Sequence, residues 1–226
     1  QVNLRIAVSQ MNFVVGDFKY NANRVENCLK EASKFGTDLI LFPELTLTGY
    51  PPEDLLLKDD FIAKNKKLLK HLTLGVKGIV AVVGYVEKVK RSLYNSAALL
   101  HKGRIVGNYR KMILPNYGVF DEKRYFIEGN EPTCFVMNGI KIGLTICEDI
   151  WDANGPGKRI CEEGQADIFL NISSSPYFKG KGKVREEVIR QRARQYKAHI
   201  VYANLIGGQD ELVFDGQSLV VAPDGT

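Results

Sequence analysis

Short apolar runs rich in β-branched residues alternate with amphipathic helical patterns along much of this chain, and this alternation constrains the fold more than any other feature. Such an order is typical of mixed α/β domains, in which helices pack on the outside of sheets. In the first third we expect strands over residues 4–9, 38–42 and 79–86 and helices over residues 21–35 and 61–72.

The middle of the chain changes character, because four strand candidates follow one another there. Lys102-Gly103 and Asn138-Gly139 have the composition of tight hairpin turns. The alternation then resumes, and one closing hairpin is expected through residues 214–222. The remaining expected elements are strands over residues 94–100, 104–109, 133–137, 140–146, 168–172 and 200–204 and helices over 159–164 and 184–198. This order predicts two sheets with helices outside them.

Length and charge exclude several classes of function. The chain has 226 residues, which suits one compact domain. Its net charge is only +5 and its basic residues are interspersed with acids, so charge does not indicate nucleic-acid binding. No apolar run approaches the roughly 20 residues that cross a bilayer, and no secretion signal is recognised. We expect a cytoplasmic protein without a nucleic-acid or membrane partner.

The distribution of cysteine and histidine predicts no metal site. The four cysteines form no Cys-x-x-Cys pair and the three histidines lie far from them, so neither zinc nor a disulfide framework is indicated.

Residues 179–183 alternate lysine and glycine, which is typical of a solvated, mobile loop. Gly155-Pro156-Gly157-Lys158 is a weak anion-binding candidate and is more typical of a turn that opens a helix.

Three chemically useful side chains each follow a predicted strand. Cys147 comes after the apolar strand 140–146, where a side chain is held rigidly and can still face a cleft. Its thiol would need a base or a cation to become a nucleophile. Glu44 is a candidate base at the end of a buried strand, and Lys111 is a candidate oxyanion ligand. Taken singly, each has a plain alternative: a packed thiol, a capping or surface carboxylate and a surface lysine.

Taken together, these residues resemble the Glu-Lys-Cys triad of the nitrilase superfamily. The resemblance is carried by Phe42-Pro43-Glu44 with Thr48-Gly49-Tyr50, by residues 110–122 and by Cys147-Glu148-Asp149-Ile150-Trp151. Within the superfamily, residues 49–56 and 114–120 are similar to the glutaminase domain of glutamine-dependent NAD synthetases. The resemblance extends from Leu4 to Thr226.

This resemblance implies both a fold and a reaction. The fold would be a four-layer α-β-β-α sandwich in a single domain over residues 1–226. Cys147 would attack the side-chain amide of glutamine, Glu44 would act as the base, and Lys111 with the N–H after the cysteine would hold the oxyanion. Ammonia would leave first, and water would then release glutamate from a γ-glutamyl thioester.

Further residues are implied around this triad. Tyr117, Glu148 and Ser174 correspond to substrate-binding positions, where Glu148 would accept hydrogen bonds from the ammonium of glutamine and the other two would offer neutral hydrogen bonds. The carboxylate of glutamine needs a cation from residues 179–185, which the sequence does not single out.

Three more residues have supporting roles that the sequence leaves open. Glu122 corresponds to an additional acid near the site, although a solvated charge explains it equally well. Tyr50 and Trp151 would either line the substrate pocket or pack in the hydrophobic core.

The resemblance also sets expectations for cofactors and partners. Hydrolysis would need no cofactor and no metal. ATP and magnesium would belong to a C-terminal synthetase domain, whose Ser-Gly-Gly phosphate loop is not found in this sequence. We therefore expect a glutaminase domain, truncated at its C-terminal end, that supplies ammonia to a synthetase domain outside this chain. By analogy, a homo-oligomer is expected.

Two other functions stay open. A free-standing amidase or carbamoylase would share the triad but would act on another small amide. A non-catalytic interaction module would instead bury Cys147 and bind an acidic partner through the helix at residues 184–198, although packing with a solvated basic face also explains that helix. The basic residues in question are Arg185, Arg190, Arg192, Arg194 and Lys197.

Overall fold

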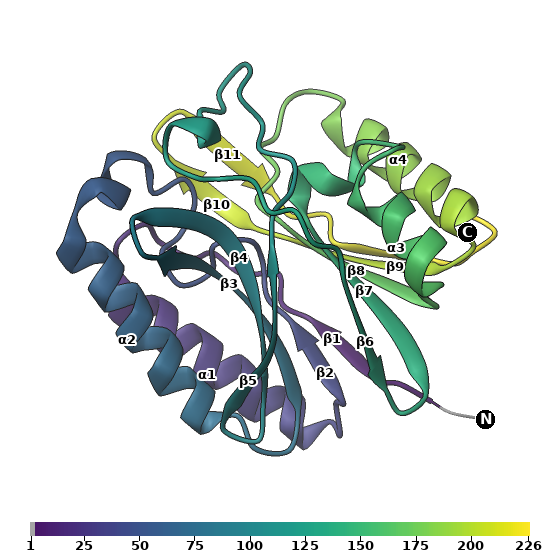
Figure 1. The fold of residues 1–226 in the computed structure, drawn as a ribbon, viewed down its shortest axis with the longest axis horizontal. Helices are drawn as coiled ribbons and strands as arrows, with labels where there is room; N and C mark the ends of the chain where they lie inside the picture. Colours follow the sequence, from purple (N-terminus) through teal and green to yellow (C-terminus); the bar gives the residue numbers. More distant parts are fainter. Residues whose placement is uncertain (1–2) are drawn as a thin grey trace.

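Two five-stranded sheets lie face to face in the computed structural model, which describes residues 3–226 (Figure 1). Helices α1 (Phe18–Lys34) and α2 (Asp59–Gly75) cover the outer face of one sheet. Helices α3 (Pro156–Gly164) and α4 (Lys181–Tyr196) cover the outer face of the other. The four-layer α-β-β-α sandwich predicted from the sequence is confirmed.

The first sheet combines parallel and antiparallel pairing. Its strand order is β1-β2-β3-β4-β5, in which β1 to β3 run parallel and β3 to β5 form an antiparallel meander. The crossovers between the parallel strands are α1 and α2, as the alternation in the sequence predicts. The strands are β1 (Ile6–Val8), β2 (Leu39–Leu41), β3 (Val80–Val89), β4 (Ser92–His101) and β5 (Arg104–Arg110).

The second sheet has the order β12-β9-β8-β7-β6, with β7, β8 and β9 parallel and the two outer strands antiparallel to their neighbours. Its crossovers are α3 and α4. A separate two-stranded sheet is formed by β10 and β11. The strands are β6 (Thr133–Met137), β7 (Ile140–Ile146), β8 (Ile168–Ser173), β9 (His199–Asn204), β10 (Ile206–Gln209), β11 (Leu212–Asp215) and β12 (Leu219–Val221).

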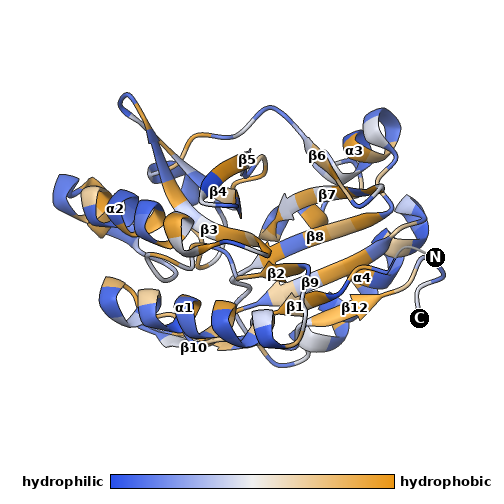
Figure 2. Ribbon diagram, turned by 90° about the horizontal axis from the view of Figure 1, so that it is seen from below, coloured by the Kyte–Doolittle hydropathy of each residue, from blue (hydrophilic) through white to orange (hydrophobic). Residues whose placement is uncertain are grey.

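Apolar side chains fill the space between the layers, and the strands are correspondingly apolar while the outer helix faces are polar (Figure 2). All three residues of β2 are buried, because a parallel strand covered on both faces has no solvated side. The buried core between the two sheets includes Leu41, Leu99, Leu144 and Leu170. This packing fixes the two sheets against each other.

Short local signals set where the helices begin. The Asp17 carboxylate accepts a hydrogen bond from the backbone N–H of Tyr20 at 3.0 Å and so caps α1. Gly155 precedes α3, and Pro156 is the first residue of that helix, where its missing N–H costs no hydrogen bond. The prediction that these residues open a helix is confirmed.

The prediction of a mobile loop over residues 179–183 is wrong in part, because α4 begins at Lys181. Gly180 has φ 89°, a left-handed conformation that suits glycine, and it turns the chain into the helix. The backbone N–H of Lys181 donates to the carbonyl of Phe178 at 2.9 Å. The helix therefore holds the second half of this segment in place.

The predicted closing hairpin over residues 214–222 is also wrong. β11 pairs with β10, whereas β12 pairs with β9 in the second sheet. Gly216 and Gln217, with φ of 67° and 51°, redirect the chain between the two pairings. The two apolar runs in this segment therefore belong to different sheets.

None of the helices within residues 3–226 combines the length and apolar character that a bilayer crossing requires.

Candidate active site

Three strands from the two sheets end near one another and carry the predicted residues. Glu44 lies three residues beyond β2, Lys111 directly follows β5, and Cys147 directly follows β7. Each strand is anchored in a buried sheet, so the three side chains start from rigid backbone.

A buried ammonium group links two carboxylates at the centre of this site. Lys111 Nζ donates to Glu44 Oε1 at 2.7 Å and to Glu122 Oε1 and Oε2 at 2.8 and 2.9 Å. The side chains of Lys111 and Glu44 are fully buried, and that of Glu122 is 6% exposed. Glu122 is therefore a buried partner of Lys111 and is not a solvated charge like the charged residues next to it in sequence.

The imbalance of one cation and two carboxylates shifts the pKa values of Glu122 and Lys111. Burial raises the pKa of Glu122 to about 7, and the charge of Glu44 acts in the same direction, while Lys111 opposes the shift. Burial alone would lower the pKa of Lys111, but Glu122 and Glu44 raise it well above its usual value. Lys111 is therefore a permanent cation, and Glu122 is the group that titrates near neutral pH.

Glu44 is fixed by residues from both sheets. Its Oε1 also accepts from Asn95 Nδ2 at 2.7 Å, and its Oε2 accepts from the backbone N–H of Ser174 at 2.9 Å. The Ser174 hydroxyl donates to the backbone carbonyl of Glu44 at 3.0 Å. The sequence assigned Ser174 to the substrate. In the structure Ser174 is fully buried and both of its donors are used by Glu44, so its contact with substrate stays a prediction.

Cys147 opens the 3₁₀ helix η3 (Cys147–Ile150) in a strained conformation. Its φ is 44°, a left-handed value that L side chains rarely adopt. The residue is 3% exposed. Burial raises the pKa of the Cys147 thiol well above its usual value, Glu44 adds to this, and Lys111 opposes it. The resting thiol is neutral at physiological pH.

Asp149 holds the turns that carry Lys111 and Cys147 together. Its Oδ1 accepts from the backbone N–H groups of Met112 and Ile113 at 3.1 and 2.9 Å. Its Oδ2 accepts from the N–H of Ile146 at 2.9 Å and from the Tyr109 hydroxyl at 2.7 Å. Sequence reasoning noted this carboxylate and gave it no role. The available signal was an acid two residues after the cysteine, close enough in sequence to accept from the backbone N–H of Ile146, the residue that precedes η3.

The other predicted residues lie around this centre. The Tyr117 hydroxyl donates to Glu148 Oε1 at 2.8 Å, and Tyr117 is exposed. Tyr50 is buried, and its hydroxyl donates to Glu122 Oε1 at 2.8 Å. Trp151 is half-buried under the ammonium of Lys181, which lies 3.9 Å from the ring centre. The structure thus brings Tyr50 to the Lys111 bridge and Tyr117 to Glu148.

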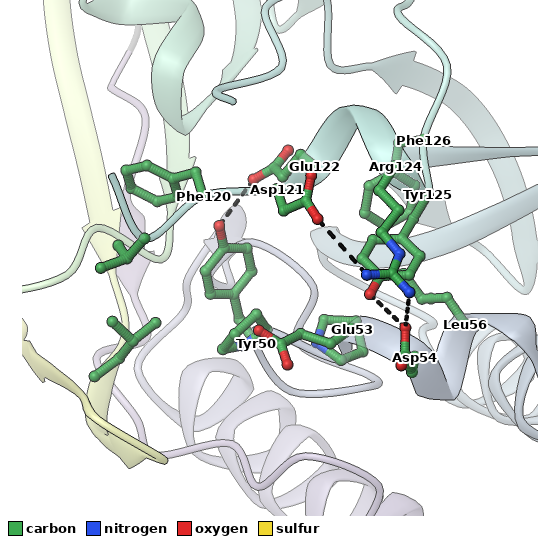
Figure 3. Close-up of a pocket in the computed structure, with 14 residues that line it drawn as sticks. Tyr50, Glu53, Asp54, Leu56, Phe120, Asp121, Glu122, Arg124, Tyr125 and Phe126 are labelled. Carbon is green, nitrogen blue, oxygen red and sulfur yellow. Dashed lines mark hydrogen bonds and ion pairs between the residues drawn. The ribbon is translucent and has the colours of Figure 1, made fainter. Parts of the chain in front are cut away.

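Tyr50 and Glu122 also line a pocket of about 180 Å³ (Figure 3). Figure 3 shows the Tyr50 hydroxyl pointing at Glu122, while Arg124 and Tyr125 turn towards Asp54 at the far side. The pocket therefore reaches the carboxylate that holds Lys111.

Two of the five basic residues noted in the sequence around α4 are buried and are used internally. Arg185 is buried and its Nη2 lies 2.9 Å from Asp215 Oδ1. Arg192 is buried and donates to the backbone carbonyls of Ile150 and Trp151 at 3.0 and 2.8 Å. Both guanidinium groups stabilise the fold, whereas Arg194 and Lys197 are exposed.

Within residues 3–226, no three His, Cys, Asp or Glu side chains gather as a metal site would require.

A strand-borne thiol beside a Glu-Lys pair in an α-β-β-α sandwich defines a class of enzyme, and sequence comparison agrees. A model of the family "Carbon-nitrogen hydrolase" matches residues 5–226. The chain therefore belongs to the carbon-nitrogen hydrolase family and is a carbon-nitrogen hydrolase. This family is the nitrilase superfamily that the Glu-Lys-Cys motifs resemble.

Within this family, the chain resembles glutamine-dependent NAD(+) synthetases. That of Thermotoga maritima is 42% identical over 98% of this chain and 39% of its own length. That of Xanthomonas campestris is 43% identical over 99% of this chain and 41% of its own length. The chain thus spans about two-fifths of these curated relatives.

Solved structures show similarity to the same kinds of protein. The glutamine-dependent NAD+ synthetase of Acinetobacter baumannii has a TM-score of 0.95 and 40% identity, covering 99% of this chain and 42% of that one. A variant of a Nesterenkonia amidase from the nitrilase superfamily has a TM-score of 0.87 and 25% identity, covering 99% of this chain and 84% of that one. The resemblance seen in the sequence is confirmed.

Replacing Asp149 with alanine should destabilise the protein. The substitution leaves the hydroxyl of Tyr109 and three backbone N–H groups without their acceptor, which should lower the free energy of unfolding by about 2–4 kcal/mol. Urea unfolding measures this. Glu131→Ala, at an exposed position just before β6, is the control and should change the value by less than about 0.5 kcal/mol.

The raised pKa of Glu122 predicts how stability depends on pH. A carboxyl group whose pKa is about 7 in the folded state and near 4.5 when unfolded binds more protons when folded between these values. Its contribution to stability therefore falls as pH rises from about 4.5 to 7. Urea unfolding at pH 5 and pH 7.5 should show a loss that Glu122→Gln reduces by about 1–3 kcal/mol. An equal loss in both proteins would contradict the raised pKa.

Proposed function

We propose that this chain hydrolyses the side-chain amide of glutamine, with Cys147 as the nucleophile. The observation that carries the proposal is the buried bridge from Lys111 to Glu44 beside a strained, buried thiol. The relatives named glutamine-dependent NAD(+) synthetase support glutamine as the amide.

The first half of the reaction needs a base, because the resting thiol is neutral. The Glu44 carboxylate takes the thiol proton while the sulfur of Cys147 attacks the amide carbon. The negative charge that develops on the carbonyl oxygen is held by Lys111 Nζ and by the backbone N–H of Glu148. The intermediate collapses as Glu44 returns the proton to the amide nitrogen. Ammonia leaves, and a γ-glutamyl thioester remains on Cys147.

The second half reverses the proton transfers. Glu44 takes a proton from water, which attacks the thioester carbonyl, and the oxyanion forms in the same place. When the carbon–sulfur bond breaks, the proton on Glu44 passes to the sulfur, glutamate is released, and the thiol is neutral again. One carboxylate thus serves both steps, which requires that it stay fixed, and the hydrogen bonds from Asn95 and Ser174 hold it.

Glu122 is a positioning residue in this scheme. It accepts hydrogen bonds from Lys111 Nζ through both of its oxygens and is itself held by the Tyr50 hydroxyl. This arrangement orients the ammonium without placing a second base at the thiol. Glu148, with Tyr117 donating to it, would receive the ammonium of the substrate.

The liberated ammonia would serve a synthetase domain outside this sequence. The chain corresponds to about two-fifths of relatives whose names describe NAD synthesis, which supports this assignment. ATP and magnesium would be used by that domain, and the hydrolysis itself would need neither. A cytoplasmic location and assembly into a homo-oligomer belong to the same proposal and rest on analogy.

A free-standing amidase is the second candidate, because the Nesterenkonia amidase shares the fold over 99% of this chain and 84% of its own length. Rates of ammonia release from glutamine and from simple amides such as acetamide separate the two functions. A higher kcat/KM for glutamine supports the proposal, and a higher value for the simple amide contradicts it.

Replacing Lys111 with alanine should lower kcat for glutamine hydrolysis by about 100-fold or more, because it removes an oxyanion ligand. Ammonia release in a coupled assay measures this. Lys123→Ala, at an exposed lysine paired with Glu128, is the control and should keep kcat within about twofold.

Loss of Lys111 also leaves two buried carboxylates together, so folding must be checked separately. Cys147→Ser keeps the Lys111 bridge and should fold normally while losing hydrolysis. Retained activity in Cys147→Ser would contradict the assignment of the nucleophile.

A further inference from the structure

The two carboxylate oxygens of Glu44 are occupied unequally. A carboxylate has about four positions at which it can accept a hydrogen bond, two on each oxygen. Oε1 uses both of its positions, because Lys111 Nζ and Asn95 Nδ2 each donate to it at 2.7 Å. Oε2 accepts from the backbone N–H of Ser174 at 2.9 Å and, among residues 3–226, from no other donor. The free acceptor position of Glu44 therefore lies on Oε2.

Asn95 reaches Glu44 from β4, in the middle of the first sheet. It is 1% exposed and lies opposite Val86 of β3. Its backbone carbonyl accepts a hydrogen bond from the N–H of Lys111 at 2.8 Å. Asn95 thus contacts the backbone of the residue that supplies the cation as well as the side chain of the base. The amide donor at Oε1 and the start of the Lys111 side chain are therefore fixed by the same strand.

The other end of the Asn95 amide contributes nothing to stability. Its nitrogen must face Glu44, because the reverse orientation would set two acceptor oxygens 2.7 Å apart. Its Oδ1 is buried and accepts no hydrogen bond from any residue that the structure describes. A buried carbonyl oxygen without a donor lowers the free energy of unfolding. Since the one hydrogen bond of this side chain within residues 3–226 goes to Glu44, its role is to be sought at Glu44.

A second buried asparagine, Asn65 of α2, shows the contrasting case in which both ends of the amide are used. Its Nδ2 donates to the carbonyl of Val86 at 2.6 Å, and its Oδ1 accepts from the N–H of the same residue at 3.3 Å. Asn65 therefore ties α2 to β3 and stabilises the fold. Because Val86 lies opposite Asn95 in the sheet, the two asparagines lie on either side of the same residue pair. Asn65 is thus a matched structural control for Asn95.

We propose that Asn95 reserves Oε2 of Glu44 for proton transfer. By donating to Oε1 together with Lys111, Asn95 keeps that oxygen unprotonated. The thiol proton of Cys147 then goes to Oε2 and from there to the amide nitrogen, and the proton taken from water goes to Oε2 and from there to the sulfur. Asn95 is a positioning residue, since it acts through Glu44. The inference rests on the proposed function, because it concerns the base of that reaction.

Two variants remove the amide donor from Oε1. Asn95→Leu keeps the branching of the side chain and replaces both polar atoms with methyl groups, whereas Asn95→Val is smaller and suits a strand. Asn65→Leu is the control. All three variants keep the ionisable side chains whose pKa values respond to the charge of Glu44, which are Tyr50, Lys111, Glu122 and Cys147. The titration of these groups is therefore common to the variants that are compared.

Each Asn95 variant should lower kcat by about 10–100-fold and keep KM within about threefold, because Oε2 is no longer held in position and Oε1 competes for the proton. The acidic limb of the pH profile of kcat/KM should move to higher pH by about one unit, since ionised Glu44 has lost a donor. Asn65→Leu should lower the midpoint of urea unfolding, while its kcat stays within about twofold and its acidic limb within about 0.2 unit of the unmodified protein.

An acidic limb that stays in place in the Asn95 variants, or that moves equally in Asn65→Leu, would overturn the role of Asn95. So would a loss of folding in both Asn95 variants, because it would assign this side chain to stability. Glutamine and acetamide are assayed in parallel, since Glu44 would serve as the base for either amide. If the unmodified protein hydrolyses only acetamide, the proposed function fails and the role of Asn95 is still tested. If it hydrolyses neither, both proposals fail.

Discussion

The ammonium of Lys111, buried between Glu44 and Glu122, is the interaction on which the rest of the site depends. Burying three ionisable groups costs free energy that hydrophobic side chains of the same volume would not. Once the cluster has formed, removing any one of its members destabilises the protein, because a buried charge is left without its partner. An arrangement of this kind adds little to stability, and its value lies in chemistry: a fixed cation beside a fixed carboxylate and a thiol.

The sandwich supplies the rigidity that this cluster needs. Glu44 and Lys111 extend from the first sheet, while Cys147 extends from the second and Ser174 reaches back from it to hold Glu44. Asp149 adds a second tie between the sheets through the turns after β5 and β7. Because the apolar core between the sheets is closely packed, the relative position of thiol, ammonium and carboxylate is fixed by the whole fold.

Much of this could be predicted from local sequence. Strand and helix order followed from hydrophobic periodicity. The three central residues were singled out because each follows a predicted strand and because together they resemble the Glu-Lys-Cys triad of the nitrilase superfamily. The closing hairpin failed because two neighbouring apolar runs pair with different strands, and pairing partners distant in sequence leave no local signal. The contacts of Asp149 with the turn after β5 and of Ser174 with Glu44 were missed for the same reason.

The most direct test of the account is the site at which a glutamine-analogue electrophile labels the protein, measured by peptide mass spectrometry. We expect modification of buried Cys147, blocked by excess glutamine, and none of Cys134, although Cys134 is exposed. Labelling of Cys134 at the same rate, or labelling of Cys147 that glutamine does not slow, would contradict the claim that Cys147 is activated within a glutamine site.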